Sequence, residues 1–468
     1  MRRTKTWETY QEAQLQEVEK IAAGYRDFLN AGKTERECIK ETVRLAEAAG
    51  YRNIETLQAE GKTVSAGDKV YAVGMKKTIA LFMMGSEPME NGMRILGAHI
   101  DSPRLDVKQN PLYEDTGIAY LDTHYYGGIK KYQWVTVPLA LHGVVAAKDG
   151  TVTEICIGED ESDPVLFISD LLIHLSAEQL EKKARVVIEG EGLDVVVGSR
   201  PAEGKKDESG EEKEAKDAVK SAVLKLLKDR YGMEEEDFLS AELEVVPAAK
   251  ARDCGLDRSM IMAYGQDDRV CAYTSLLAQL ETEPQTATCC TLLVDKEEIG
   301  SVGATGMQSR FFENTVAELM NLAGQYSELA LRRCLGRSRM LSSDVSAGYD
   351  PMFAAAFEKK NAAYLGKGLV LNKFTGARGK SGSNDANAEY IGRIRGCFDK
   401  HDVAFQTAEL GKVDVGGGGT IAYISALYGM EVIDSGVAVL NMHAPQEVTS
   451  KADVYEAVLG YKAFLKEA

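Results

Sequence analysis

The sequence predicts an α/β protein with a mostly parallel sheet flanked by helices and interrupted by a β-rich insert. After residue 246, helical and strand-like runs alternate, which is typical of a parallel sheet covered by helices on both faces. Between residues 107 and 246 hairpin-like runs replace this alternation. We therefore predict one discontinuous domain, residues 1–106 and 247–468, and one inserted domain, residues 107–246.

The chain begins with helices and then changes to strands. Residues 7–29 have helical apolar spacing, and Thr34 with Glu37 forms a capping box that would start a second helix, ended by Gly50. Short β-rich runs follow from Lys69 onward, and the last of them leads directly into His99. These runs are residues 70–73, 78–84 and 94–98.

The insert and the C-terminal part differ in their pattern of predicted helices and strands. In the insert, the turn Asp149-Gly150 separates the strand-like runs 135–147 and 151–157, residues 184–197 form another run, and the polar residues 202–216 read as a solvated loop. The alternating runs of the C-terminal part are 269–280, 288–294, 311–335, 383–398, 404–409, 420–428, 432–440 and a last helix from 453.

Composition excludes several classes of function. The net charge is −17, and no basic stripe follows the chain, so nucleic acid is not an expected partner. No segment approaches the ~20 apolar residues that span a bilayer, so we predict a cytoplasmic protein without membrane contact. The eight cysteines contain no C-x-x-C pair, and we expect them to be reduced and buried.

Five short segments carry the residue types of a two-metal hydrolytic site. Such a site needs neutral imidazoles, carboxylates that hold and bridge the ions, and one further carboxylate that moves a proton. The chain has only six histidines, and two of them lie in these segments. The segments are His99-Ile100-Asp101, Asp267-Asp268-Arg269, Glu297-Glu298-Ile299-Gly300, Ser343-Asp344 and Met442-His443.

Each of the first three segments also has an ordinary structural interpretation. His99 and Asp101 suit a ligand and the carboxylate that orients it, although a polar turn after an edge strand has the same pattern. Asp267 and Asp268 precede a helix, where carboxylates also act as caps. Glu297 and Glu298 follow a buried strand and repel one another, a cost that a cation removes, but an acidic solvated turn is the alternative.

The remaining candidates are weaker alone. Asp344 follows a short strand-like run, and His443 ends an apolar strand that Pro445 stops. The other histidines, 124, 142, 174 and 401, are interpreted as core histidines. Residues 416–419 are four glycines before Thr420; they lack the ending of a phosphate loop, so we expect them to form a wall of a substrate cleft.

These segments resemble the aspartyl aminopeptidase family of metallopeptidases, in the same order and including the insert. The resemblance rests on residues 97–105, 266–269, 295–301, 342–344 and 442–443. It implies a zinc-peptidase-type catalytic domain, an inserted domain used in dimerisation, and dimers that assemble into a tetrahedral dodecamer. It also implies that peptides with a free amino terminus are the substrates.

The resemblance implies a role for each site residue. One ion would be held by His99 and Asp344, the other by Glu298 and His443, and Asp267 would bridge them. Glu297 would be the general base and Asp101 would orient His99. Zinc suits these ligands, although manganese or cobalt would also serve.

One stretch departs from the family pattern. Where the family has an Ile-Pro-His-Leu-type stretch, this chain has Ile168-Ser169-Asp170-Leu171, with His174 following. Preference for an acidic first residue would then need the positive charge of Lys373, Arg378 or Lys380. Two other functions fit the same residues: a two-metal amidohydrolase or deacylase, and a noncatalytic shell or binding protein, which would have no use for Glu297.

Overall fold

The structure, a computed structural model, describes residues 6–202 and 217–467. The chain forms two compact units. The first unit comprises residues 1–102, 251–442 and 447–468, and the inserted unit comprises residues 103–250 and 443–446, in each case as far as they are described. The predicted insert, 107–246, falls within the inserted unit.

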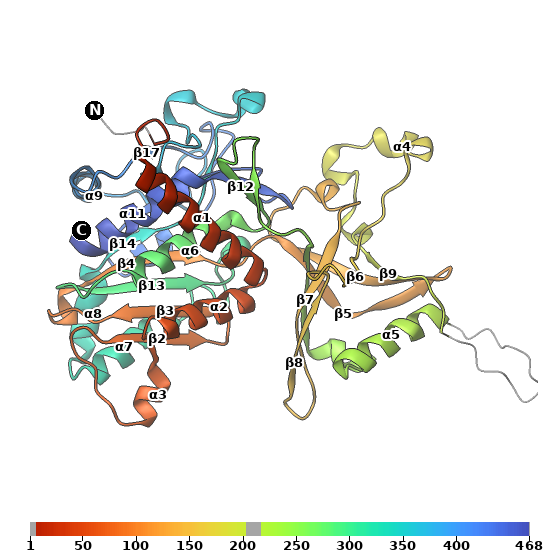
Figure 1. Ribbon diagram of the computed structural model, residues 1–468, viewed down its shortest axis with the longest axis horizontal. Helices are drawn as coiled ribbons and strands as arrows, with labels where there is room; N and C mark the ends of the chain where they lie inside the picture. Colours follow the sequence, from red (N-terminus) through yellow and green to blue (C-terminus); the bar gives the residue numbers. More distant parts are fainter. Residues whose placement is uncertain (1–5, 203–216, 468) are drawn as a thin grey trace, which may run out of the picture. The chain divides into compact units, whose positions relative to one another are not determined.

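A nine-stranded mixed sheet forms the centre of the first unit (Figure 1). Its order is β1 (Arg52–Asn53), β2 (Lys69–Gly74), β3 (Thr78–Met83), β13 (Thr288–Val294), β4 (Met93–His99), β14 (Arg339–Ser342), β18 (Glu431–Gly436), β16 (Leu369–Asn372) and β17 (Phe405–Thr407). The four neighbours β13, β4, β14 and β18 run parallel to one another. Their carboxyl ends therefore meet at one edge of the sheet, where α/β proteins place their ligands.

Helices cover both faces of this sheet, because its strands are apolar on both sides. In β3, Ile79 and Leu81 enter one core, whereas Ala80 and Phe82 enter the other. The first core includes residues of α1 (Glu12–Ala31), α2 (Glu35–Ala48), α6 (Gln266–Leu280), α9 (Ala388–Lys400) and α11 (Lys451–Glu467). The second includes residues of α3 (Ile54–Ala59), α7 (Phe311–Leu322), α8 (Glu328–Arg337) and α10 (Ala422–Ala426).

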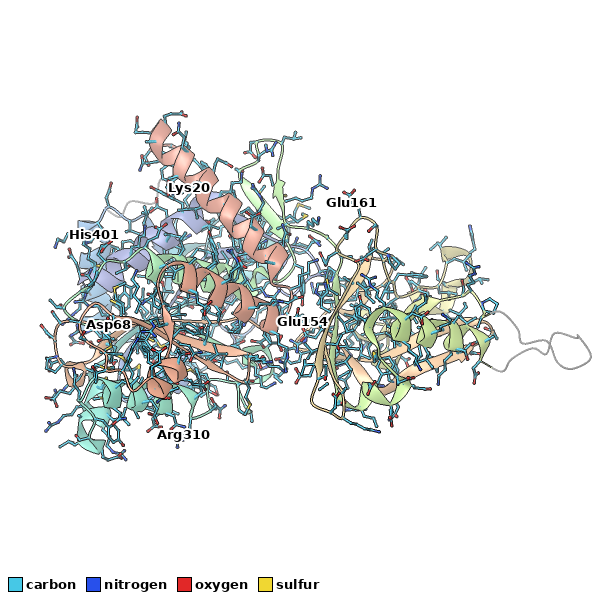
Figure 2. The ribbon with its side chains drawn as sticks, turned by 60° about the horizontal axis from the view of Figure 1, so that its bottom comes forward. Lys20, Asp68, Glu154, Glu161, Arg310 and His401 are labelled. Atoms are coloured by element: carbon cyan, nitrogen blue, oxygen red, sulfur yellow. The ribbon has the colours of Figure 1, made fainter. Side chains whose placement is uncertain are left out.

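Local signals place the early elements. The predicted capping box at α2 is confirmed: the Glu37 N–H donates to Thr34 Oγ1 at 3.3 Å, and the Thr34 N–H donates to Glu37 Oε2 at 3.1 Å. Charged side chains such as Lys20 and Asp68 lie on the outside of this unit (Figure 2).

A second, five-stranded sheet completes the first unit. Its order is β11 (Arg252–Cys254), β12 (Met260–Ala263), β20 (Glu447–Ser450), β19 (Ala438–Leu440) and β15 (Ser346–Ala347). Strand β18 of the large sheet ends at Gly436 and β19 of this sheet begins at Ala438, so the chain passes from one sheet to the other at residue 437.

The inserted unit is built on an antiparallel sheet of six strands. Their order is β8 (Val152–Ile157), β7 (Leu139–Ala146), β10 (Ala241–Pro247), β5 (Arg104–Asp115), β6 (Ile118–Tyr126) and β9 (Val195–Gly198). Its helices are α4 (Ala177–Leu180) and α5 (Ala218–Tyr231). The hairpin predicted around Asp149-Gly150 is confirmed, since β7 and β8 pair in antiparallel register.

Short 3-10 turns connect many of these elements. They are η1 (Met89–Asn91), η2 (Lys131–Gln133), η3 (Ile173–Leu175), η4 (Ala184–Val186), η5 (Gly190–Gly192), η6 (Glu235–Ser240), η7 (Glu297–Ile299), η8 (Pro351–Ala356) and η9 (Lys359–Asn361).

Several sequence predictions were wrong in detail. Residues 311–335 form two helices, because Gly324 has a positive φ that ends the first. The predicted strand at 184–197 contains two 3-10 turns, and only its last residues join β9. The helix α5 was not predicted at all. Of the predicted loop 202–216, residues 203–216 lie outside the described residues.

The cysteine prediction holds for six of the eight residues, all of them free. Cys156 is exposed and Cys254 is half-buried. In the described residues, no helix combines the length and apolar character needed to cross a membrane. The cytoplasmic location stays a prediction.

Candidate metal centre

The candidate residues lie at the ends of adjacent parallel strands. Val294, the last residue of β13, pairs with His99, the last residue of β4. On the other side of β4, Ser342 of β14 pairs with Gly97, so Asp344 follows its strand to the level of His99. The register of the sheet therefore brings together residues that are far apart in the sequence.

His99 is held with one ring nitrogen directed at its neighbours in the site. The ring is buried, and its Nδ1 lies 3.0 Å from the Asp101 carbonyl oxygen and 3.2 Å from Asp101 Oδ1. These two acceptors favour the tautomer that carries its proton on Nδ1. The Nε2 atom, 3.3 Å from Asp267 Oδ1 and 3.8 Å from Glu297 Oε2, is then the atom available to a metal.

Asp101 connects two strand ends. Besides facing His99, its carboxylate accepts the backbone N–H groups of Glu297 and Glu298, each at 3.2 Å. Both glutamates belong to the turn η7 that follows β13. One buried carboxylate thus holds His99 and the adjacent acidic pair in fixed positions relative to one another.

The acidic pair at the start of α6 is not a helix cap. Gly265 occupies the cap position without a side-chain hydrogen bond, and Asp267 and Asp268 have non-helical backbone angles. The Asp268 Oδ2 atom instead accepts the backbone N–H of His99 at 3.3 Å. The Asp267 N–H donates to Glu447 Oε2 at 3.0 Å, and its carbonyl accepts the Ser102 hydroxyl at 2.6 Å.

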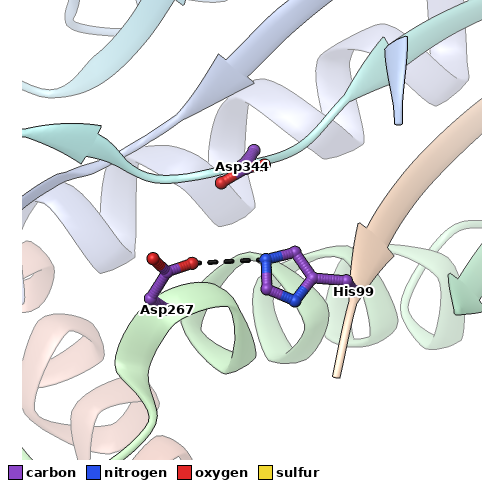
Figure 3. Close-up of side chains that lie close together, drawn as sticks. All are labelled: His99, Asp267 and Asp344. Carbon is purple, nitrogen blue, oxygen red and sulfur yellow. Dashed lines mark ion pairs between the residues drawn. The ribbon is translucent and has the colours of Figure 1, made fainter. Parts of the chain in front are cut away.

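Three side chains offer ligand atoms close enough to share one ion. His99, Asp267 and Asp344 each have a nitrogen or oxygen atom within 4.8 Å of the others (Figure 3). An imidazole with two carboxylates is a donor set that suits zinc and related divalent ions. The residues of this cluster therefore fit a metal ion.

The electrostatics of the cluster favour a cation. Burial lowers the pKa of His99, but the hydrogen bonds to Asp101 and Asp267 outweigh it and raise that pKa well above its usual value. Burial, together with the charge of Asp268, raises the pKa of Asp344 well above its usual range. Crowded carboxylates of this kind are stabilised in their ionised form by a bound cation.

Glu298 and His443, the predicted ligands of the second ion, belong to different units of the chain. Glu298 lies in the η7 turn of the first unit and is half-buried. His443 belongs to the inserted unit, where its Nδ1 lies 2.8 Å from the Gly128 carbonyl oxygen. Their shared role at a second ion stays a prediction.

The remaining histidines correct one expectation. Of these four histidines only His142 is buried, with its Nε2 3.2 Å from Glu159. His124 and His174 are exposed, and His401 is half-buried beside Glu467. A histidine in a β-rich run can lie on the outer face of the sheet. The sequence alone did not reveal which side chains of the run point inward and which point outward.

Sequence reasoning missed three buried acids near the site. Asp295 accepts the Thr305 hydroxyl at 2.5 Å, and burial raises its pKa to about 6. Glu447 holds Asp267, and Asp434 accepts the Thr420 hydroxyl at 2.6 Å. The signal was present for Asp434, because a carboxylate within an apolar strand is rarely buried without a specific partner.

Comparison with known proteins agrees with the metallopeptidase class that the fold and the cluster define. The family model described as "Aminopeptidase I zinc metalloprotease (M18)" matches residues 28–465. A probable M18 family aminopeptidase 1 of Clostridium acetobutylicum is 60% identical over 98% of this chain and 97% of the relative. A relative of the same description in Thermotoga maritima is 44% identical over 97% of each chain.

Solved structures show the same fold over the whole chain. The crystal structure of an M18 family aminopeptidase from Thermotoga maritima has a TM-score of 0.93 at 42% identity, covering 100% of both chains. That of aminopeptidase I from Clostridium acetobutylicum has a TM-score of 0.90 at 57% identity, again covering 100% of both. The chain belongs to the M18 family of aminopeptidases and is a metalloaminopeptidase, a hydrolase.

Proposed function

We propose that this aminopeptidase removes the first residue of peptides at a two-metal centre. The observation that carries the proposal is the cluster of His99, Asp267 and Asp344, with Glu297 Oε2 3.8 Å from His99 Nε2. His99 and Asp344 would hold one ion, Glu298 and His443 the other, and Asp267 would bridge them. The donor set suits zinc, with manganese and cobalt as alternatives.

The protein groups supply positioning and proton transfer. Bound divalent ions would lower the pKa of a water molecule and polarise the scissile carbonyl. Glu297 would take the proton from that water and deliver it to the leaving amine. Asp101 keeps His99 Nδ1 protonated and holds the backbone of Glu297, so the base and the ligand keep a fixed separation.

The Glu297→Gln variant tests this assignment. An amide of the same shape cannot accept the proton, so we expect kcat to fall by ~10²–10⁴-fold with the metal content unchanged. Glu55→Gln, an exposed glutamate on α3, is the matched control and should behave as wild type. Wild-type activity of Glu297→Gln would contradict the role of general base.

The preference at the first substrate position stays a prediction. Asp385 lies 3.0 Å from Lys380 Nζ and 4.0 Å from Lys373 Nζ, so two of the three candidate cations already face an acid. A series of aminoacyl substrates assayed with metal-analysed protein tests both the reaction and the preference. Turnover of Asp and Glu substrates below that of neutral ones would contradict an acidic preference, and hydrolysis of only acylated dipeptides would favour a deacylase.

We also propose that the protein is a homo-oligomer that associates through the inserted unit. Leu172 and Ile173 there are 54% and 67% exposed, and Leu171 and Leu175 beside them are exposed apolar side chains as well. A solved structure with this fold, 19% identical and with a TM-score of 0.75, is described as the mApe1 dodecamer of S. cerevisiae. A tetrahedral dodecamer is the assembly that we expect, and light scattering of the purified protein tests it.

A further inference from the structure

Asp434 lies one strand away from the metal cluster. In the register of the sheet, Ser342 pairs with Gly97 on one side and with Asp434 on the other. Gly97 and Ser342 come two residues before His99 and Asp344, respectively. Because directly paired residues share a face of the sheet, Asp434 is the next side chain in the row that underlies these two candidate ligands.

The Asp434 carboxyl is buried and has one specific protein contact. It is 1% exposed, and its Oδ1 accepts the Thr420 hydroxyl at 2.6 Å. Thr420 Oγ1 in turn accepts the Ala422 N–H at 3.3 Å, at the start of α10. Burial raises the pKa of Asp434 to about 7, so keeping an acid at this position has an energetic cost. Such a cost is tolerated where the contact has a purpose.

Thr420 ends the run of glycines from residue 416 to 419. These residues have no side chains with which to hold the loop, and the backbone packs tightly at the first two of them: a Cβ at Gly416 would lie 1.6 Å from the Leu410 carbonyl oxygen. A Cβ at Gly417 would lie 2.5 Å from Ala377. The hydroxyl of Thr420 is thus a side-chain anchor at the end of an otherwise side-chain-free segment.

The anchored end of the loop lies against the strand that carries His99. The Cδ1 atom of Ile421 is 3.4 Å from the position that a Cβ would take on Gly97. The charge of Glu297 also acts on the Asp434 carboxyl. The loop therefore approaches the metal edge of the sheet at the point where Asp434 holds it.

We propose that Asp434 is a positioning residue: through Thr420 it fixes the 416–419 glycine loop as a wall of the substrate cleft and thereby sets KM and first-residue selectivity. This inference rests on the proposed function, because it places the substrate at the edge formed by His99 and Asp344. Asp434 itself touches no reacting atom.

Paired variants test the hydrogen bond. Thr420→Val keeps the shape but removes the hydroxyl, and Asp434→Ala removes the acceptor. We expect each to raise KM by ~10-fold, the order of one lost hydrogen bond to a charged group, with kcat within about threefold and metal content unchanged. Thr420→Ser and Asp434→Asn keep a donor and an acceptor, and should restore KM to near the wild-type value.

Thr449→Val is the matched control, because Thr449 is also buried and donates its hydroxyl to the Ala438 carbonyl at 3.0 Å in the other sheet. A purely structural role for the Asp434 contact would lower Tm in Thr420→Val as in Thr449→Val and leave KM and selectivity unchanged; that result would overturn the inference. If Asp434→Ala does not fold, Thr420→Val and Thr420→Ser carry the test alone.

Different results would contradict the proposed function and the proposed role of Asp434. A wild-type protein that binds no metal, or a fully active Glu297→Gln variant, would contradict the proposed function. An active wild type whose KM and first-residue selectivity are unchanged in Thr420→Val would contradict only the role of Asp434.

Discussion

The first unit buries charged side chains, whereas the inserted unit exposes apolar ones, and both arrangements are unusual in a folded protein. The first unit buries acids at one sheet edge: Asp101, Asp267 and Asp268 are each 4% exposed or less. The inserted unit exposes apolar side chains, with Leu172 54% and Ile173 67% exposed. Buried charge is costly without a counter-charge, and exposed apolar clusters are costly without cover.

The buried acids of one unit and the exposed apolar side chains of the other each indicate the kind of partner that the unit binds. The buried acids of the first unit lie around His99, whose Nε2 atom is 3.3 Å from Asp267 Oδ1, and His99, Asp267 and Asp344 could together hold a metal ion. For the exposed apolar side chains of the inserted unit, Leu171, Leu172, Ile173 and Leu175, an apolar protein surface is the natural cover. The two proposals place catalysis and assembly in different parts of one chain, and the following variants test this division.

The largest effect is expected from Asp344→Asn. The amide keeps the shape but removes a charged ligand, so we expect loss of bound metal and a fall in kcat of ~10³-fold or more. In the metal-free protein the same change removes repulsion among acids and should raise Tm. Metal analysis, kinetics and thermal unfolding after chelation measure these effects; a metal-free Tm below that of wild type would contradict the repulsion argument.

A buried acid away from the metals should behave differently. Asp453 accepts the Gly366 and Gly368 N–H groups at 2.7 Å each, and burial raises its pKa to about 7. The unfolded chain releases this proton near pH 4 and the folded protein only near pH 7. Its contribution to the free energy of unfolding is therefore greatest below pH 4 and falls by an amount on the order of 4 kcal/mol as pH rises to 7.

Asp453→Asn removes this titration. Urea unfolding between pH 4 and 8 should show a decline in wild type that is smaller in the variant, with both curves parallel above pH 7. Identical pH dependence in the two proteins would show that Asp453 has an ordinary pKa. Unlike Asp344→Asn, this variant should keep its metal.

Leu172→Asp tests the proposed assembly surface. A charge placed in a buried apolar interface costs about 3 kcal/mol, so we expect the subunit Kd to rise by about 100-fold, as measured by light scattering at several concentrations. Leu256→Asp is the control, because Leu256 is a fully exposed leucine of the first unit. Equal association of both variants and wild type would remove residues 171–175 from the interface.

The smallest effect concerns packing density. A cavity of about 460 Å³ lies between α5 and the sheet of the inserted unit, and Val223 lines it together with Leu141 and Leu243. Val223→Leu adds one methylene to this space and should stabilise the protein by ~0.8 kcal/mol. Val270→Leu, in the fully packed core of the first unit, should destabilise it by ~1–3 kcal/mol. Denaturant midpoints of the two variants should therefore shift in opposite directions.

Regular elements of the first unit were predictable because their signals are local. The run 288–294 forms β13 with those bounds, and the capping box of Thr34 and Glu37 starts α2. Helix α5 was missed although Val219, Val223 and Leu227 are spaced four residues apart, as on one face of a helix. The division of 432–440 into β18 and β19 depends on two different sheets and has no local signal.

For the candidate site too, residue types could be read from the local sequence, whereas contacts between distant residues could not. That His99, Asp101, Glu297 and Asp344 are candidate site residues was readable from residue types at strand ends, and Asp267 from an acidic pair before a helix. That Asp101 would hold the N–H groups of Glu297 and Glu298 was not, because the contact joins residues about 200 positions apart. Asp434 was missed although a carboxylate within an apolar strand was a local signal, and its partner Thr420 lies only 14 positions earlier.

By itself, the sequence determined the class of fold, the family and the donor atoms, because periodicity, turn chemistry and side-chain type are written residue by residue. Only the tertiary structure decided which strands are neighbours, which acid each ring nitrogen of His99 faces, and that Asp434 anchors the glycine loop. These properties depend on the register between distant segments, and register is fixed by packing of the whole sheet rather than by any one stretch of chain.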